Sequence, residues 1–175
     1  MTLDDLGQRI CILGPSGSGK STLAQAIGRG RHLPVVHLDQ LHHLPNTDWQ
    51  PRPEAAFLAL HDQAIAGGRW VIEGNYSRSL PDRLARATGV ILLDASMMTS
   101  LTRYFRRAWF ERDRRGDLEG SSSSVKWVMI RHIAVSTPPS RKRYRALFEK
   151  IDLPKILLPS PRELADFYRA TGLAR

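Results

Sequence analysis

The sequence predicts an α/β protein in which helices cover both faces of a parallel sheet. Short apolar segments alternate with helical segments along the chain, an arrangement typical of parallel sheets. A glycine-rich turn at residues 14–19 joins the first apolar segment to the first helix. Acids stand at the ends of three apolar segments, at Asp39, Glu73 and Asp94. Because parallel strands bind ligands at their carboxyl ends, we expect these acids at a functional edge.

Five apolar segments have the length and composition of buried strands, and turn residues bound them. They lie at residues 10–13, 34–39, 70–73, 89–94 and 155–158. Helical patterns follow the glycine-rich turn and recur at residues 54–66, 81–87, 97–111, 125–135, 140–150 and after Pro161. Residues 1–8 are predicted to be a short polar lead-in.

Two long connections interrupt the alternation of strands and helices. Prolines at 45, 51 and 53 predict an irregular start to an insertion of about residues 40–66. A glycine- and serine-rich segment at residues 116–124 lies in a second insertion, of about residues 103–145. We expect a single domain over residues 1–175, with both insertions placed as covers over the ligand-binding edge.

The glycine-rich turn carries the pattern Gly14-x-x-x-x-Gly19-Lys20-Ser21 between a predicted strand and a predicted helix. In that context the pattern predicts a loop that binds the phosphates of a nucleoside triphosphate. Its N–H groups and the helix N-terminus attract an anion, Lys20 neutralises phosphate charge, and Ser21 can hold Mg²⁺. The predicted nucleotide-binding residues are Gly14, Pro15, Ser16, Gly17, Ser18, Gly19, Lys20, Ser21 and Thr22.

The bulk composition is that of an ordinary soluble protein of one domain. The single cysteine, Cys11, lies in the first predicted strand, which excludes a disulfide framework and a cysteine metal cluster. No segment resembles a signal peptide, and no apolar run approaches the length of a membrane span. We therefore expect a cytoplasmic protein without membrane partners.

The formal net charge of +9 is concentrated in one part of the chain, since residues 95–150 hold 13 Lys and Arg against 5 Asp and Glu, a balance of +8. Such a segment can bind nucleic acid, or it can close on anionic substrates as a clamp. Arg103 and Arg107 lie four residues apart and so share one helix face. Guanidinium groups neutralise phosphoryl-transfer charge well, which favours the clamp and makes both arginines candidate catalytic residues. The remaining candidates, which stay unranked, are Arg112, Arg114, Arg115, Arg141, Arg143 and Arg145.

The acids at the predicted strand ends differ in their expected roles. Asp39 and Glu73 are candidates to hold Mg²⁺ through water or to accept a hydroxyl proton, whereas Asp94 precedes Ala-Ser and also fits a helix cap. The adjacent His42 and His43 have poor spacing for a metal site. Trp49, in the proline-rich insertion, fits equally a ring that stacks on a base and one that packs the insertion.

Several segments together resemble the adenylate-kinase-like P-loop proteins, and most closely the subgroup of "DNA topology modulation proteins" (FlaR-like). The resemblance covers most of the chain and rests on the glycine-rich motif, His37-Leu-Asp39, Trp70-Val-Ile-Glu-Gly-Asn-Tyr76, Leu-Leu-Asp94 and the late Ser-Pro-Arg-Glu-Leu. It implies a three-layer P-loop NTPase fold whose five-stranded parallel sheet has the order 2-3-1-4-5. It also implies an acceptor-binding insertion after the second strand and a lid after the fourth.

The resemblance also assigns particular residues. The family's arginine pair after the fourth strand falls on Arg103 and Arg107, and its adenine-contacting loop falls on residues 159–161. Glu73 departs from the family, which has an aspartate there. The adenylate-kinase Gly-Phe-Pro-Arg loop is replaced by residues 74–77, Gly-Asn-Tyr-Ser, so the acceptor is left open.

The favoured hypothesis is an ATP-dependent kinase that transfers the γ-phosphoryl group to a small anionic acceptor, a nucleoside monophosphate. ATP and Mg²⁺ are the implied cofactors, and Ser21 and Glu73 are the candidate metal-binding residues. The candidate acceptor-binding residues are Asp39, Trp49, Asn75, Tyr76 and Arg141. The alternatives are a kinase of hydroxylated metabolites, of the gluconate or shikimate type, and a nucleotide-dependent protein that binds DNA. The sequence leaves the oligomeric state open.

Overall fold

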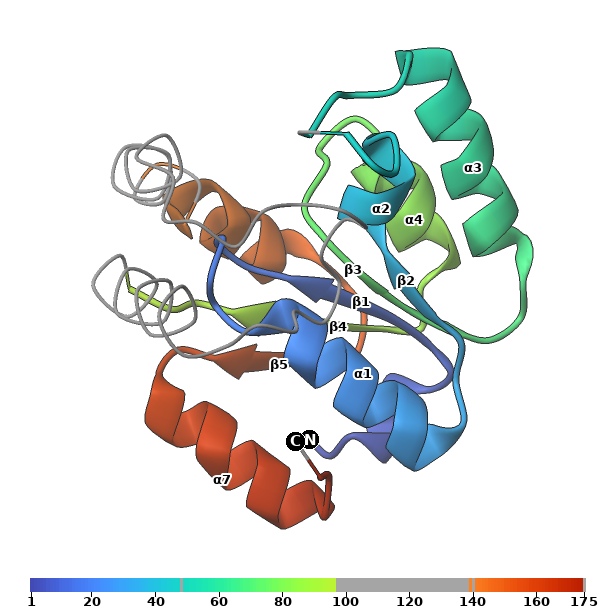
Figure 1. The fold of residues 1–175 in the computed structure, drawn as a ribbon. Helices are drawn as coiled ribbons and strands as arrows, with labels where there is room; N and C mark the ends of the chain where they lie inside the picture. The colour runs from blue at the N-terminus through green and yellow to red at the C-terminus, as the bar shows by residue number, and fades with distance from the viewer. Residues whose placement is uncertain (48, 97–138, 140, 175) are drawn as a thin grey trace.

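Five parallel strands form a single sheet in the computed structural model, which describes residues 1–47, 49–96, 139 and 141–174 (Figure 1). The sheet order is β2-β3-β1-β4-β5, and every pair of neighbouring strands is parallel. The strands are β1 (Arg9–Leu13), β2 (Val35–His37), β3 (Trp70–Glu73), β4 (Gly89–Leu93) and β5 (Lys155–Leu158). The predicted α/β class and the strand order 2-3-1-4-5 are therefore confirmed.

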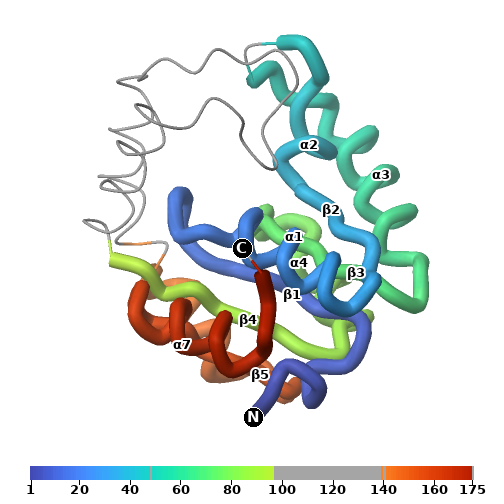
Figure 2. Tube along the Cα trace, turned by 60° about the horizontal axis from the view of Figure 1, so that its bottom comes forward, coloured from blue at the N-terminus to red at the C-terminus, as the bar shows by residue number. Residues whose placement is uncertain are grey.

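Helices connect these strands and lie on both faces of the sheet. They are α1 (Lys20–Arg31), α2 (Leu38–His42), α3 (Glu54–Ala66), α4 (Leu80–Arg86) and α7 (Pro161–Thr171). Residues 141–150 are also helical, and a 3-10 turn, η1 (Asp4–Leu6), precedes β1. Figure 2 shows α2 and α3, in cyan and teal, on the β2 side of the sheet, and α7, in red, beside β5.

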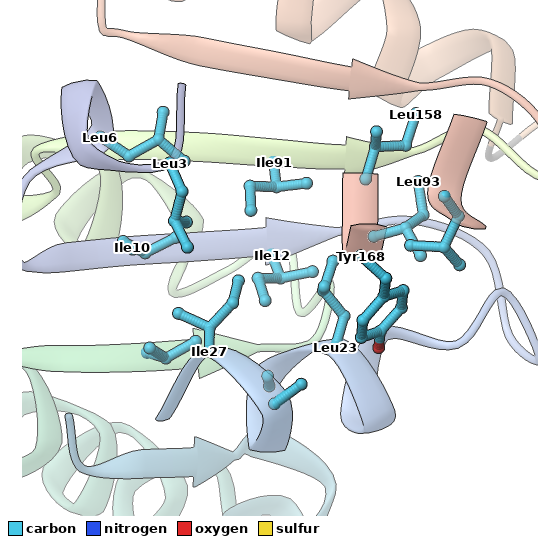
Figure 3. Packing of buried hydrophobic residues seen from close by; sticks show 14 of the residues in the cluster. Leu3, Leu6, Ile10, Ile12, Leu23, Ile27, Ile91, Leu93, Leu158 and Tyr168 are labelled. Atoms are coloured by element: carbon cyan, nitrogen blue, oxygen red, sulfur yellow. The ribbon is translucent and has the colours of Figure 1, made fainter. Parts of the chain in front are cut away.

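The alternating side chains of the strands divide the core into two layers. Ile10 and Ile12 of β1 pack with Leu23 and Ile27 of α1 and with Tyr168 of α7, as Figure 3 shows. The opposite face of β1 presents its other side chains to a second cluster, which residues of α3, α4 and the 141–150 helix complete. Because successive strand residues point to opposite faces, this near-continuous apolar sequence is what a sheet covered on both sides requires.

Two predictions about local structure are wrong. The strand predicted at residues 34–39 ends at His37, and α2 begins at Leu38, so Asp39 lies in the first turn of a helix. Leu38 and Leu41 share one face of that helix and both pack in the second core cluster, which favours a helix over a strand. The predicted polar lead-in also contributes Leu3 and Leu6 to the core.

Other predictions concern parts of the chain that lie outside the described residues. These are the helices expected at 97–111 and 125–135, the connection at 116–124 and most of the lid at about 103–145. Within the described ranges, no helix has the length and apolar character needed to cross a membrane.

The close approach of η1 to β4 gives a test of this packing. A Cβ built on Gly89 would lie 2.5 Å from Leu6 Cβ and 2.6 Å from Leu6 O. Gly89→Ala should therefore lower the free energy of unfolding by about 1 to 3 kcal/mol, because overpacking forces the backbone to shift. Chemical denaturation measures the change. Gly68→Ala is the matched control, since a Cβ there meets nothing within 4 Å, and equal stability of the two variants would contradict the packing.

Candidate active site

The loop between β1 and α1 has the backbone shape that the glycine-rich motif predicts. Gly14, Gly17 and Gly19 adopt φ values of 145°, 75° and 99°, which side chains with a Cβ rarely tolerate. Helix α1 begins at Lys20, directly after the loop. Lys20 Nζ donates a hydrogen bond of 3.0 Å to the carbonyl of Pro15, so the lysine folds back over the loop. The loop thus brings together the N-terminus of α1, which attracts anions, and the positive charge of Lys20.

Three side chains converge beside the loop. Glu73, at the end of β3, is 3% exposed, and its Oε1 accepts hydrogen bonds from Ser21 Oγ at 3.0 Å and His37 Nδ1 at 2.9 Å. The other ring nitrogen of His37 lies 2.9 Å from Gln25 Nε2. Because a carboxylate only accepts hydrogen bonds, His37 carries its proton on Nδ1 and accepts from Gln25 at Nε2. This chain fixes the position of Glu73.

The charge of Glu73 is favoured despite its burial. Burial by itself would raise the pKa of Glu73, but the hydrogen bond from His37 and the positive charge of Lys20 more than offset it. The pKa of Glu73 therefore lies below its ordinary value, and the side chain offers a negative charge at the base of the loop.

These residues suit a magnesium ion. Mg²⁺ prefers oxygen ligands and is commonly held by one or two protein oxygens together with phosphate oxygens and water. Ser21 and Glu73 supply a hydroxyl and a carboxylate, and among the described residues no hydrogen bond ends on Glu73 Oε2. The described part of the chain contains no group of three His, Cys, Asp or Glu side chains arranged to hold a metal.

The segment after Glu73 connects the loop to Asp39. The side-chain amide of Asn75 accepts a hydrogen bond from the N–H of Gly14 at 3.2 Å and donates one to its carbonyl at 3.0 Å. The hydroxyl of Tyr76 donates a hydrogen bond of 2.6 Å to Asp39 Oδ1. Burial and the negative charge of Asp39 raise the pKa of Tyr76, so the hydroxyl keeps its proton and acts as a donor.

A cluster of rings surrounds this pair. The ring of His42 lies 4.7 Å from that of Tyr76 and 5.1 Å from that of Phe57, measured between centroids. His43 contacts His42 and Trp49 in edge-to-face geometry at 4.5 Å and 5.1 Å. Burial lowers the pKa of His42, and the neighbouring His43 lowers it further. Trp49 therefore packs within the insertion, where it adds to an aromatic wall near Asp39.

Asp94, at the end of β4, holds two arginines of the 141–150 helix. It is 1% exposed, and its carboxylate accepts hydrogen bonds from Arg141 Nε and Nη2 and, at 2.9 Å, from Arg145 Nη1. The hydrogen bond to Asp94 raises the pKa of Arg141. The structure thus makes Asp94 the anchor of a two-arginine cluster, and the helix that the sequence also allowed it to cap lies outside the described residues.

The remaining predicted residues divide into two groups. Arg103 and Arg107 lie outside the described residues. Ser16, Gly17, Gly19, Lys20, Ser21 and Thr22 are all partly exposed along the loop and the first turn of α1, and Gly14, Pro15 and Ser18 are buried beneath them.

Sequence reasoning missed three side chains near the site. His37 orients Glu73, whereas the sequence indicates for it only a place in a strand and in the family motif His37-Leu-Asp39. Arg83 is buried beneath residues 74–76, and its hydrogen bonds could not be read from a helical pattern. Arg52 is the only Lys or Arg in residues 40–66, and its Nε is buried without a hydrogen-bond partner among the described residues. The isolation of Arg52 in an otherwise uncharged or acidic insertion was a signal available in the sequence.

Solved structures that are similar to this fold include small-molecule kinases. The chain is similar to a shikimate kinase from Acinetobacter baumannii in complex with shikimate, with a TM-score of 0.57 and 12% identity over 96% of this chain and 95% of that chain. It is similar to a shikimate kinase from Bacteroides thetaiotaomicron, with a TM-score of 0.52 and 18% identity over 94% of each chain. A sugar kinase from Janibacter sp. matches with a TM-score of 0.51 and 17% identity over 94% of this chain and 92% of that one.

These likenesses show that the chain has the α/β fold of these kinases, with its five-stranded parallel sheet. No model of a protein family matches the sequence, and no curated protein matches it. At such low identities the fold alone is shared, so the chemistry must be argued from the residues of this chain.

The Asp94 cluster gives a test of this part of the site. Asp94→Asn should lower the free energy of unfolding by about 1 to 3 kcal/mol, because two guanidinium groups lose hydrogen bonds to a buried charge. Asp166→Asn is the matched control, since Asp166 pairs with Arg169 in the exposed part of α7, where ion pairs contribute little. Chemical denaturation of both variants measures the difference. An Asp94→Asn variant with an unchanged free energy of unfolding would contradict the proposal that Asp94 anchors the two arginines.

Proposed function

We propose that this protein is an ATP-dependent phosphotransferase that moves the γ-phosphoryl group of Mg-ATP to a small acceptor. The observation that carries the proposal is the hydrogen bond between Ser21 and the buried Glu73 at the start of α1. It puts a hydroxyl and a carboxylate beside a loop built to receive phosphates, which is the arrangement that phosphoryl transfer requires. The fold shared with solved kinases supports the same proposal.

The residues of the loop bind the triphosphate. Backbone N–H groups of residues 14–19 and the N-terminus of α1 hold the phosphate oxygens, and Lys20 leaves the Pro15 carbonyl to neutralise them. Ser21 and Glu73 hold Mg²⁺, which when bound supplies charge neutralisation at the phosphates. Gln25 and His37 keep Glu73 in place through their hydrogen bonds. Arg103 and Arg107 are proposed to stabilise the charge of the transition state, with the lid excluding water.

The acceptor is oriented at Asp39. The hydroxyl of Tyr76 occupies Oδ1 of Asp39, which leaves Oδ2 to accept a hydrogen bond from the acceptor. Trp49 lines this region, and Arg141, anchored by Asp94, is proposed to meet its anionic group. The amide of Asn75 is bonded to Gly14, so its contribution to acceptor binding is through the backbone and the position of Tyr76.

A nucleoside monophosphate is the acceptor that we favour. Its base is a planar ring, and the rings of His42, Trp49 and Tyr76 form an aromatic wall beside Asp39. Bases stack on the faces of aromatic rings, and His42, Trp49 and Tyr76 are each partly exposed. The resemblance of the sequence to adenylate-kinase-like proteins supports the same acceptor, whereas the replacement of their Gly-Phe-Pro-Arg loop by residues 74–77 leaves the acceptor to be tested.

A hydroxylated metabolite is the second candidate. The solved structures with this fold include a shikimate kinase with shikimate bound and a sugar kinase. For such an acceptor Asp39 takes up the proton of the attacking hydroxyl. Its Oδ2 suits this role, because it has no hydrogen bond within the part of the chain that the structure describes.

The proposal is tested by incubating the protein with Mg-ATP and panels of nucleoside monophosphates and hydroxylated acids. We expect ADP release that depends on one acceptor class, and a kcat that falls about 10²- to 10³-fold in Lys20→Ala, because a charge aimed at the transition state is lost. The exposed Lys150→Ala is the matched control and should keep full activity. Acceptor-dependent turnover that survives in Lys20→Ala would sink the mechanism.

Asp39 distinguishes the two acceptor classes. If the acceptor is a hydroxyl group, Asp39→Asn should lower kcat about 10²- to 10⁴-fold, because proton transfer is lost. If the acceptor is a phosphate oxygen, no proton must be removed, and we expect mainly a higher KM for the acceptor. Tyr76→Phe keeps the ring and removes the hydrogen bond to Asp39. It should change the same quantity as Asp39→Asn, kcat for a hydroxyl acceptor or KM for a phosphate acceptor, but to a smaller extent. Wild-type kinetics in both variants would exclude Asp39 from the site.

A further inference from the structure

Arg83 of α4 is a buried cation without an acidic partner. Its side chain is 0% exposed, and no carboxylate among the described residues forms an ion pair with it. Nη2 donates hydrogen bonds to the carbonyls of Gly74 at 3.0 Å and Asn75 at 3.1 Å. Nε and Nη1 are buried without hydrogen-bond partners in the described part of the chain.

A buried guanidinium group without a carboxylate partner destabilises the folded protein. Removing a charge from water disfavours it by several kcal/mol unless other groups compensate, and burial lowers the pKa of Arg83 accordingly. Cys11, Tyr144 and Glu73 favour the charged form of Arg83, but burial outweighs them. Cys11 itself compensates weakly, since burial raises the pKa of its thiol to about 11 even beside the guanidinium. An apolar side chain would fill this position between α4 and the sheet at a lower cost. Packing therefore does not account for an arginine here.

The hydrogen bonds of Arg83 hold the segment that joins the two halves of the site. Asn75 is bonded through its side chain to both backbone groups of Gly14, and Tyr76 is bonded to Asp39. Tyr76 has a φ of 28°, a conformation that costs about 1 to 3 kcal/mol outside glycine and persists only where its surroundings enforce it. The carbonyls that accept from Arg83 belong to the two peptide units that precede and follow Asn75. Fixing both units fixes the direction of the Asn75 side chain.

We propose that Arg83 is a positioning residue that fixes the backbone of residues 74–76. Asn75 then holds the Gly14 end of the phosphate loop in position, and Tyr76 holds the side chain of Asp39 in position. This inference rests on the proposed function, because it assigns to one buried side chain the alignment of the nucleotide with the acceptor. Misplacement of reacting groups by about 1 Å can cost about 10²-fold in rate, which gives such a device its value.

The test compares Arg83→Met and Arg83→Lys with Arg86→Met, a matched variant on the exposed side of the same helix. Three quantities are measured for each: the thermal midpoint, the Kd for a non-hydrolysable Mg-ATP analogue by calorimetry, and amide hydrogen exchange in peptides covering residues 14–19 and 74–79. A merely structural arginine would change the thermal midpoint and leave the Kd of the folded protein unchanged.

We expect Arg83→Met to keep or raise the thermal midpoint, since a buried charge is replaced by an apolar side chain of similar length. Its Kd for the analogue should rise about tenfold, and exchange should accelerate in both peptides. Arg83→Lys should lie between Arg83→Met and the wild type, because its amine retains a donor for the carbonyls. Arg86→Met should match the wild type in Kd and exchange.

A double variant shows whether Arg83 acts through Asn75. If it does, Arg83→Met combined with Asn75→Ala binds the analogue no more weakly than the worse single variant, because the two changes break one linkage. Fully additive losses, or an unchanged Kd and exchange in Arg83→Met, would overturn the inference. If Arg83→Met does not fold, Arg83→Lys decides by the same readouts. A wild-type protein that binds no nucleotide defeats the proposed function instead, and hydrogen exchange then still reports whether Arg83 holds residues 74–76.

Discussion

The parallel pairing of β1, β2 and β3 is the constraint on which the site depends. Ile12 of β1 and His37 of β2 both stand opposite Glu73 of β3. This register alone places three features at one level of the sheet edge: the phosphate loop, the buried carboxylate and the histidine that orients the carboxylate. A slip of one residue in the β1–β3 pairing would turn the side chain of Glu73 to the other face of the sheet, away from Ser21, and a slip in the β2–β3 pairing would separate Glu73 from His37. The hydrophobic alternation that fills the two core layers thus also fixes the chemistry at the edge.

Two buried carboxylates at this edge are compensated in opposite ways. Glu73 receives hydrogen bonds from the hydroxyl of Ser21 and the imidazole of His37, which stabilise its negative charge, as a site for a cation needs. Asp94 receives hydrogen bonds from two guanidinium groups, which leaves a net positive cluster. Its neighbour Leu93 lies close to the first glycine of the loop, since a Cβ on Gly14 would touch the carbonyl of Leu93. A metal ion bound to a triphosphate needs both: a negative contact for the ion and positive contacts for the phosphate oxygens.

The sequence predicted the sheet well because a short apolar strand followed by a glycine-rich turn has few alternative folds. It predicted the tight turn between β1 and α1 because its glycines allow positive φ values. It failed at α2, where three residues of strand propensity run into a helix that only tertiary packing of Leu38 and Leu41 defines. It also failed for His37, Asp94 and Arg83. Glu73 is 36 residues from His37, the arginine partners of Asp94 are 47 and 51 residues away, and the partners of Arg83 are backbone carbonyls. The local sequence patterns that indicate helices, strands and turns do not predict such contacts.

A crystal structure with Mg²⁺ and a non-hydrolysable ATP analogue tests the central claim most directly. The account predicts phosphates enclosed by residues 14–19, the metal ion in contact with Ser21 and adjacent to Glu73, and Lys20 moved from the Pro15 carbonyl to the phosphates. Density for the nucleotide at another place on the sheet, or phosphates in the loop with the metal ion remote from both Ser21 and Glu73, would contradict it.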